Sequence, residues 1–108
     1  KPSTRQRFVS MSFDFPSSER EVSILIGETG CDADLAKRLV GIAKAFRALK
    51  DRDLEEVAST RLLVYAATLI KSGFDVSAAC RAALVETLTD DPETVEALME
   101  IVNATFGR

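Results

Sequence analysis

The segment that most constrains the fold spans residues 59–73, "STRLLVYAATLIKSG", in which nearly every residue from Leu62 to Ile70 is apolar. At about 100° per residue, its polar and half-polar side chains gather in one helical stripe ~60° wide. These side chains are Arg61, Tyr65, Thr68 and Ser72. A helix that is apolar through more than half of its circumference needs neighbours on more than one side. The segment therefore predicts the central helix of a helical bundle, capped by Ser59 and followed by Gly73.

Arg61 is an unusual residue for the first turn of this predicted helix. A helix N-terminus has unpaired N–H groups and a partial positive charge, so a guanidinium there costs a few tenths of a kcal/mol. The position is favourable if an anion binds at the same place. The alternative is an ordinary surface arginine, paired with Glu55 or Glu56. Spacing alone favours the surface arginine.

Four other helices are predicted from capping signals and apolar periodicity. The proposed caps are a Ser18–Glu21 capping box, Asp32, Asp75, and Asp91 followed by Pro92. The apolar residues of these helices are Val22, Leu25 and Ile26; Leu35, Leu39, Ile42, Phe46 and Leu49; Val76, Ala79, Cys80, Ala83 and Leu84; and Val95, Leu98, Met99, Val102 and Phe106. The first of these helices should end near residues 27–30, and "KDRDLEE" should form a charged connector.

The N-terminal segment "RQRFVSMSFDFP" alternates as a strand does. Val9, Met11, Phe13 and Phe15 would share one face, and Pro16 would end the strand. No second strand of similar quality follows, and a lone strand leaves its backbone groups unpaired. The predicted fold class is therefore mainly α, a five-helix bundle preceded by one β-strand of a sheet whose other strands lie outside these residues.

Composition limits the possible chemistry. The chain has 108 residues, enough for one small domain, and its net charge of −3 argues against a broad nucleic-acid or anionic-membrane surface. It contains no histidine, which excludes Ser-His triads and His-containing zinc sites. Cys31 is interpreted as a loop or capping cysteine and Cys80 as a buried helix cysteine, in agreement with a reducing, cytosolic location. No apolar run reaches ~18 residues, so no membrane span is expected.

Two motifs resemble active-site sequences without fitting them. "GETGCDAD", from Gly27, lacks the second Gly followed by Lys and Ser or Thr that a phosphate loop requires, so we interpret it as a helix C-cap turn. The carboxylates of "TDDPE" are better explained by capping than by acid–base catalysis. We expect no metal site and no self-contained active site. Arg5 and Arg7 precede the predicted strand, where they could reach a neighbouring subunit; composition alone favours a solvated basic terminus.

Three stretches, "KPSTRQRFVSMSFDFP", "ASTRLLVYAATLIKSG" and "ACRAALVETLTDDPETVEALMEIVNATF", together resemble the C-terminal part of the CbbQ/NirQ/NorQ proteins. These are AAA+ ATPases related to the MoxR group, and the resemblance covers nearly the whole chain. Within the family we favour the rubisco-activating CbbQ branch. The resemblance implies that residues 1–16 are the last strand of the AAA+ core with its arginine-finger loop, and that residues 17–108 form the helical lid. The phosphate loop and the Mg²⁺-binding acidic motif would precede Lys1.

The resemblance also implies roles for individual residues. Arg7, immediately before Phe8, matches the candidate arginine finger, and Arg5 is the second candidate. Ser59, Thr60 and Arg61 match the S-x-R of the sensor 2 motif, with Arg61 as the nucleotide-binding residue in its own or a neighbouring subunit. Many MoxR-like members have proline in place of Thr60, and we expect no loss from threonine because the first helical residue needs no N–H partner.

The function implied is that of a ring-forming ATPase, as a hexamer, which uses ATP and Mg²⁺ in the full-length protein to remodel a client enzyme. Rubisco is the favoured client, and a von Willebrand A-domain protein is the implied partner. The parent protein would be cytoplasmic or carboxysome-associated, and these residues alone should hydrolyse no ATP. Two alternatives stay open: NorQ/NirQ-type activation of nitric oxide reductase, and a helical interaction module without nucleotide chemistry.

Overall fold

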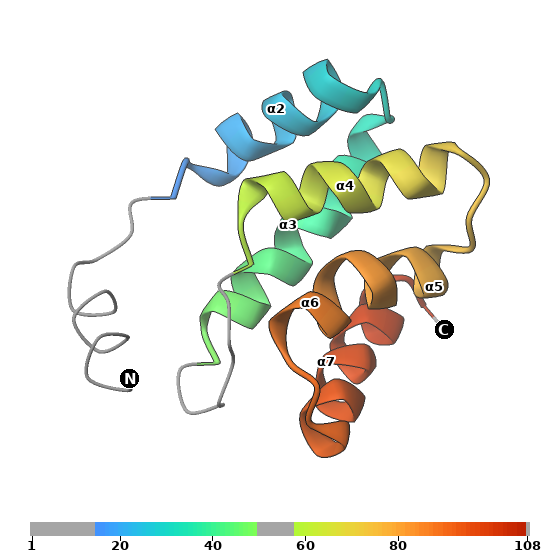
Figure 1. Cartoon of the computed structure of the whole chain (residues 1–108). Coiled ribbons are helices and arrows are strands. Elements are labelled where there is room, and N and C mark those ends of the chain that lie inside the picture. The colour runs from blue at the N-terminus through green and yellow to red at the C-terminus, as the bar shows by residue number, and fades with distance from the viewer. Residues whose placement is uncertain (1–14, 50–57, 108) are drawn as a thin grey trace.

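The computed structural model describes residues 15–49 and 58–107, which fold almost entirely into helices. In chain order these are α2 (Ser18–Thr29), α3 (Ala33–Arg47), α4 (Thr60–Lys71), α5 (Val76–Cys80), the π-helical turn η1 (Arg81–Val85), α6 (Glu86–Leu88) and α7 (Pro92–Thr105). The elements α5, η1 and α6 follow one another without a break and together form one helix. The predicted five-helix bundle is therefore confirmed (Figure 1). The predicted strand, except for Phe15 and Pro16, and the connector "KDRDLEE" lie outside the described residues. Within the described ranges, no helix has both the length and the apolar character needed to cross a bilayer.

Helix α4 is the central helix of the bundle, as predicted from its apolar circumference. It packs against α2, α3, α5 and η1, and α7 covers the other side of α3 (Figure 1). Its buried residues are Leu63, Ala66 and Ala67. All four residues of the predicted polar stripe of α4 are exposed. Because the stripe follows from helical periodicity alone, the sequence was sufficient to predict it.

Most helix starts agree with the predicted caps. The side chains of Asp32, Ser59, Asp75 and Asp91 each accept a hydrogen bond from a backbone N–H in the following first turn. The Ser18–Glu21 capping box is wrong. The N-cap is Ser17, whose Oγ accepts from the Arg20 N–H at 3.2 Å, and Glu21 points into the protein instead.

The ends of two helices are marked by glycine with positive φ. Gly30 has a φ of 75°, and its N–H donates to the carbonyl of Ile26, which closes α2 as the predicted C-cap turn. Gly73 has a φ of 105° just beyond the end of α4. Both angles lie in the left-handed region that side chains disfavour, which explains glycine at these two positions.

The apolar faces predicted for the helices form one continuous core. The fully buried large side chains include Leu25, Leu39, Ile42, Phe46, Leu63, Leu84, Leu88 and Leu98. One prediction is wrong, because Ile26 is 37% exposed. Both cysteines are buried and form no disulfide; burial was predicted for Cys80, and it raises the pKa of that thiol to about 12.

The π-helical turn η1 has no counterpart in the sequence-based predictions. The Glu86 N–H donates to the Arg81 carbonyl five residues earlier, and the two side chains form an ion pair at 3.0 Å. The wider turn places three consecutive residues, Ala83, Leu84 and Val85, in the core. Three consecutive residues of a regular helix span a wider arc than the usual apolar stripe, and the π-helical turn narrows that arc.

Candidate functional site

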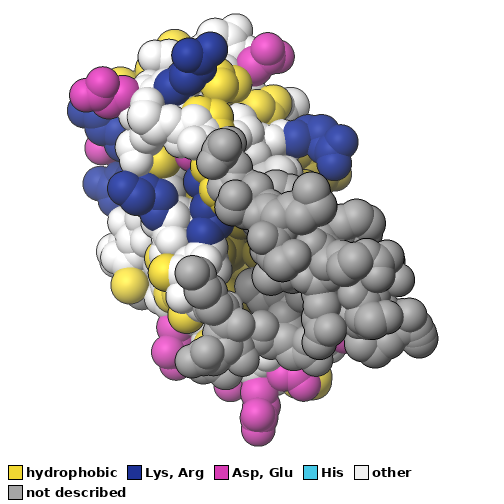
Figure 2. All heavy atoms as spheres, turned by 90° about the vertical axis from the view of Figure 1, so that its left-hand side faces the viewer, with side chains coloured by type: hydrophobic (Ala, Val, Ile, Leu, Met, Phe, Trp, Pro, Cys, Tyr) yellow, Lys and Arg dark blue, Asp and Glu magenta, His cyan; other side chains and the backbone are white. Residues whose placement is uncertain are grey.

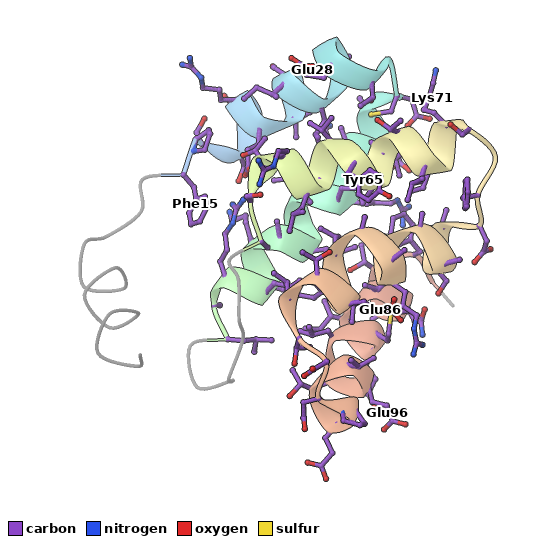
Figure 3. All side chains as sticks on the ribbon, viewed as in Figure 1. Phe15, Glu28, Tyr65, Lys71, Glu86 and Glu96 are labelled. Atoms are coloured by element: carbon purple, nitrogen blue, oxygen red, sulfur yellow. The ribbon has the colours of Figure 1, made fainter. Side chains whose placement is uncertain are left out.

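Arg61 is the second residue of α4 and lies exposed at the N-terminal end of its polar stripe. No residue in the described ranges forms a hydrogen bond or an ion pair with its guanidinium. Further along the stripe, Tyr65 is 52% exposed on the outer side of α4 (Figure 3). Glu55 and Glu56, the partners considered for a surface arginine, lie outside the described residues. The guanidinium can therefore reach a ligand that approaches the start of α4.

The first turn of α4 is set by Ser59. Its Oγ accepts a hydrogen bond from the Leu62 N–H at 3.3 Å, and its carbonyl accepts from the Leu63 N–H at the same distance. The first N–H groups of a helix have no intrahelical acceptor, and the helix dipole is positive at this end. These groups and Arg61 together favour an anionic oxygen ligand such as a phosphate.

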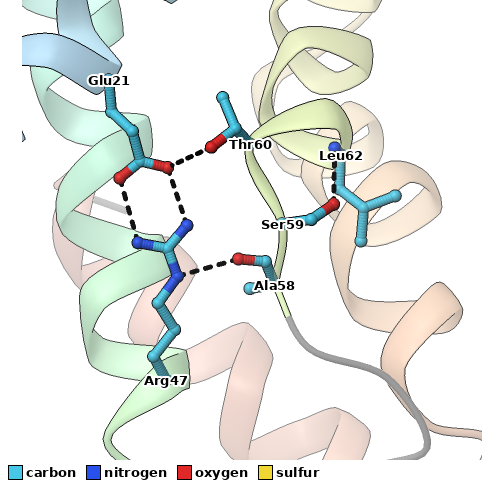
Figure 4. A network of polar contacts seen from close by, with 6 residues as sticks. All are labelled: Glu21, Arg47, Ala58, Ser59, Thr60 and Leu62. Carbon is cyan, nitrogen blue, oxygen red and sulfur yellow. Dashed lines mark hydrogen bonds and ion pairs between the residues drawn. The ribbon is translucent and has the colours of Figure 1, made fainter. Parts of the chain in front are cut away.

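Glu21 lies directly behind this end of α4 and is the buried charge among the described residues, with 1% of its surface exposed. Its Oε1 accepts a hydrogen bond from Arg47 Nη1 at 3.0 Å, and its Oε2 accepts from Arg47 Nη2 at 2.7 Å (Figure 4). The Thr60 hydroxyl donates to the same Oε2 at 2.8 Å. Each carboxylate oxygen is thus satisfied, as a buried charge requires.

The electrostatics of Glu21 reflect two opposing effects. Burial pushes its pKa upward, whereas the hydrogen bonds from Arg47 and Thr60 and the positive charges of Arg47 and Lys44 push it downward. The second group of effects is larger, so the pKa of Glu21 lies below its usual value. Glu21 is therefore an anion at neutral pH.

Arg47, at the end of α3, connects Glu21 to two further segments. Its Nε donates to the Ala58 carbonyl at 2.9 Å, just before α4. Its Cζ lies 3.8 Å from the centroid of the Phe15 ring, in the segment that leads into α2. Figure 3 shows Phe15 at that edge of the bundle, next to the start of α4. The Arg47 guanidinium thus contacts three parts of the chain close to the start of α4, the helix that carries Arg61.

The sequence-based predictions missed this network. Glu21 was assigned to a capping box, and Arg47 was assigned no role. Thr60 was treated as a residue that only needs a suitable backbone, but its hydroxyl is one of the donors to Glu21. One available signal was the position of Glu21 four residues before Leu25, which places the carboxylate on the buried face of α2.

The surface around this end of the bundle carries mixed charge. On the face shown in Figure 2, Lys and Arg side chains lie mainly in the upper part, and the lower edge carries Asp and Glu. A hollow of about 810 Å³ between η1, α6 and α7 does not include Arg61, and its lining contains Glu86, Asp90, Glu96 and Glu100. These carboxylates would repel a phosphate, so the start of α4 is the better anion site.

The other predicted functional residues are not placed by the structure. Arg5 and Arg7 lie outside the described residues, so the arginine-finger assignment stays a prediction. Within the described ranges, no group of three or more His, Cys, Asp or Glu side chains is arranged to hold a metal ion. The described site presents a guanidinium and the N–H groups of a helix N-terminus, which are the donors that an anion would require.

Comparison with known proteins decides the family. The model of the family described as CbbQ/NirQ/NorQ C-terminal matches residues 21–105. The chain belongs to this CbbQ/NirQ/NorQ family. The match runs from the first turn of α2 to the end of α7 and includes Glu21, Arg47, Thr60 and Arg61. The helical bundle described above is therefore the C-terminal region of a CbbQ/NirQ/NorQ protein.

Curated relatives carry all three family names. The denitrification regulatory protein NirQ of Pseudomonas aeruginosa is 59% identical over 103 residues, which cover 95% of this chain and 40% of the relative. The protein NorQ of Paracoccus denitrificans is 51% identical, and the protein CbbQ of Hydrogenophilus thermoluteolus is 46% identical, each over 99% of this chain and 40% of the relative. The chain thus spans about 40% of the length of these relatives. The preference for the CbbQ branch is not supported, because the NirQ and NorQ relatives are more similar.

Proposed function

We propose that this chain is the lid region of a ring-forming AAA+ ATPase, and that Arg61 contacts a phosphate of the bound nucleotide. The observation that carries the proposal is the position of Arg61 in a CbbQ/NirQ/NorQ C-terminal region. It is exposed at the N-terminal end of the central helix, without a partner in the described ranges. A surface arginine without function would be slightly more stable further along the stripe, away from the positive end of the helix dipole, whereas a phosphate contact requires the end with the unpaired N–H groups.

In this proposal the other parts of the catalytic site come from outside the described residues. ATP and Mg²⁺ would be held mainly by the AAA+ core, to which residues 1–16 would contribute the last strand. Arg7, with Arg5 as the second candidate, would act as the arginine finger of a neighbouring subunit in a hexameric ring. Such a finger stabilises the charge that develops on the γ-phosphate. A von Willebrand A-domain protein would connect the ring to its client enzyme.

For the client, we propose an enzyme of denitrification, with nitric oxide reductase as the first candidate, in place of rubisco. The support is the ranking of the relatives, since the two NirQ proteins are 59% and 52% identical to this chain and the CbbQ protein is 46% identical. The test is to co-express the full-length protein with nitric oxide reductase or with inhibited rubisco. Recovery of rubisco activity alone would contradict this choice.

The nucleotide contact is tested with Arg61→Ala in the full-length protein, and Arg20→Ala is the matched control. Arg20 is also an exposed arginine in the first turn of a helix, but it lies in α2. Loss of a hydrogen bond to a charged group is worth ~1.5–3 kcal/mol, so we expect Arg61→Ala to weaken ATP binding or hydrolysis by about 10- to 100-fold. Arg20→Ala should leave both unchanged.

The competing function, a helical interaction module without nucleotide chemistry, gives the opposite result. It predicts that Arg5→Ala, Arg7→Ala and Arg61→Ala all leave ATP hydrolysis by the full-length protein unchanged. The ATPase proposal predicts a large loss for Arg7→Ala, with partial recovery in rings that mix variant and wild-type subunits.

A further inference from the structure

The buried network behind α4 connects three segments that are distant in sequence. Glu21 lies in the first turn of α2, Arg47 is the last residue of α3, and Thr60 is the first residue of α4. The Arg47–Glu21 contact joins residues 26 positions apart, and the Thr60–Glu21 contact joins residues 39 positions apart. The carboxylate of Glu21 is therefore the point where the three helix ends meet (Figure 4).

The geometry of the network is more restrictive than its stability requires. A buried ion pair can often be replaced by apolar side chains of similar volume with little loss of stability. Apolar side chains, however, do not define the orientation of a neighbouring group as charged hydrogen bonds do. The planar fork of Arg47 meets both oxygens of Glu21 at 2.7 and 3.0 Å, which defines the orientation of the carboxylate. The Thr60 hydroxyl then has one defined acceptor, Oε2, at 2.8 Å.

The position of Arg61 depends on the hydrogen bonds of Arg47, Glu21 and Thr60. Its guanidinium has no hydrogen bond or ion pair within the described ranges, so its own side chain does not fix where it lies. The backbone that carries it is held on the N-terminal side by two contacts, Thr60 to Glu21 and Ala58 to Arg47. The Ser59 cap shapes the first turn of α4 through a hydrogen bond with the Leu62 N–H in the same helix. Packing of the buried face of α4 places the helix as a whole, and the hydrogen bonds that tie its N-terminal end to α2 and α3 involve Arg47 and Glu21.

We propose that Arg47 is a positioning residue that acts through Glu21 and Thr60 to fix the place from which Arg61 reaches the nucleotide. This inference rests on the proposed phosphate contact of Arg61. Arg47 itself contacts no ligand, because it faces Glu21, Ala58 and Phe15. Through Phe15, 3.8 Å from its Cζ, the same residue connects the segment before α2 with the start of α4. A shift of that segment would thus be transmitted to Arg61.

The test is a double-mutant cycle in the full-length protein. The first variant is Thr60→Val, which removes the hydroxyl and keeps the shape of the side chain; Thr60→Ser keeps the hydroxyl and is the matched control. The second variant is Arg47→Lys, which keeps the charge and removes the fork. Each is combined with Arg61→Ala. The measurements are the dissociation constant of a fluorescent ATP analogue, kcat and KM for ATP hydrolysis, and the helical content by circular dichroism.

We expect Thr60→Val and Arg47→Lys to weaken binding of the ATP analogue about three- to tenfold, within the range seen for coupled neighbours. Thr60→Ser should bind as the wild type does. In the Arg61→Ala background, neither Thr60→Val nor Arg47→Lys should weaken binding further, because the residue that they position is gone. If their effects persist in that background, or if Thr60→Val binds normally, the inference is wrong. If Arg61→Ala itself leaves binding unchanged, the proposed function fails first.

Discussion

The half of the bundle formed by α2, α3 and the start of α4 encloses a buried ion pair, whereas the half formed by η1, α6 and α7 has its ion pair on the surface. In the first half, Arg47 and Glu21 have side chains that are 12% and 1% exposed. In the second, Arg81 and Glu86 have side chains that are 52% and 55% exposed, above a core of apolar residues that includes Leu84 and Leu88. Both halves share the apolar core, and the first half adds a buried ion pair to it.

The two halves thus illustrate two kinds of interaction: apolar packing, which stabilises the core, and charged hydrogen bonds, which also fix the orientation of side chains. Apolar side chains stabilise a core without strong directional preference, because the hydrophobic effect depends on buried area. Charged hydrogen bonds add a defined geometry. The directional half is the one that carries Arg61, the residue predicted to meet a ligand. The apolar half contacts α4 through η1 and serves as its support.

The largest effect should come from breaking the buried ion pair on one side. Arg47→Met leaves Glu21 buried without its partner, which should lower the free energy of unfolding by roughly 3–5 kcal/mol. The double variant Glu21→Leu/Arg47→Met should recover most of this loss, since no buried charge is left. Urea unfolding followed by circular dichroism measures both. Equal destabilisation in the single and the double variant would contradict the role of the pair.

The next effect concerns the apolar half. Leu84 is fully buried in η1, so Leu84→Ala should cost about 3 kcal/mol through lost transfer energy and the cavity that remains. Leu84→Met, which nearly conserves volume, should cost less than about 1.5 kcal/mol. Unlike the variants at Glu21, neither should change the dependence of stability on pH. Thermal unfolding at two pH values checks this.

A smaller effect should appear when the pH is lowered, because the half that contains Glu21 has a buried carboxylate. The pKa of Glu21 is lowered in the folded protein, so near pH 4 the unfolded chain binds more protons than the folded one. The stabilisation is complete above the ordinary glutamate pKa of about 4.3 and is lost as the pH falls through the lower folded value. Stability measured from pH 7 to pH 3 should fall more for the wild type than for Glu21→Gln. Parallel curves would show that Glu21 does not titrate as described.

The smallest effect should come from the surface ion pair. Arg81→Ala removes a contact in which both side chains are more than half exposed, so the loss should be below about 0.5 kcal/mol. The same difference measured in high salt should be smaller still. A loss as large as that of Arg47→Met would mean that the Arg81–Glu86 pair, which spans the π-helical turn, holds η1 in place.

Local sequence was sufficient to predict the helices, most of their caps and the exposure of Arg61. Each of these depends on residues within one or two turns: the Oγ of Ser59 reaches Leu62, and the stripe that begins at Arg61 follows from the helical repeat. The burial of Cys80 followed in the same way from the apolar face of its helix. The resemblance of whole stretches then identified the family, although the preference for the CbbQ branch is not supported by the identities.

Tertiary structure alone decided the role of Glu21 and the path of residues 81–85. A glutamate three residues after a serine fits a capping box equally well, and only the approach of Arg47 and Thr60 from other helices turns it into a buried anion. The π-helical turn likewise arises where Ala83, Leu84 and Val85 must all face the core. Periodicity describes one helix at a time, whereas these features are set by contacts between helices far apart in the chain, which is why the sequence left them undecided.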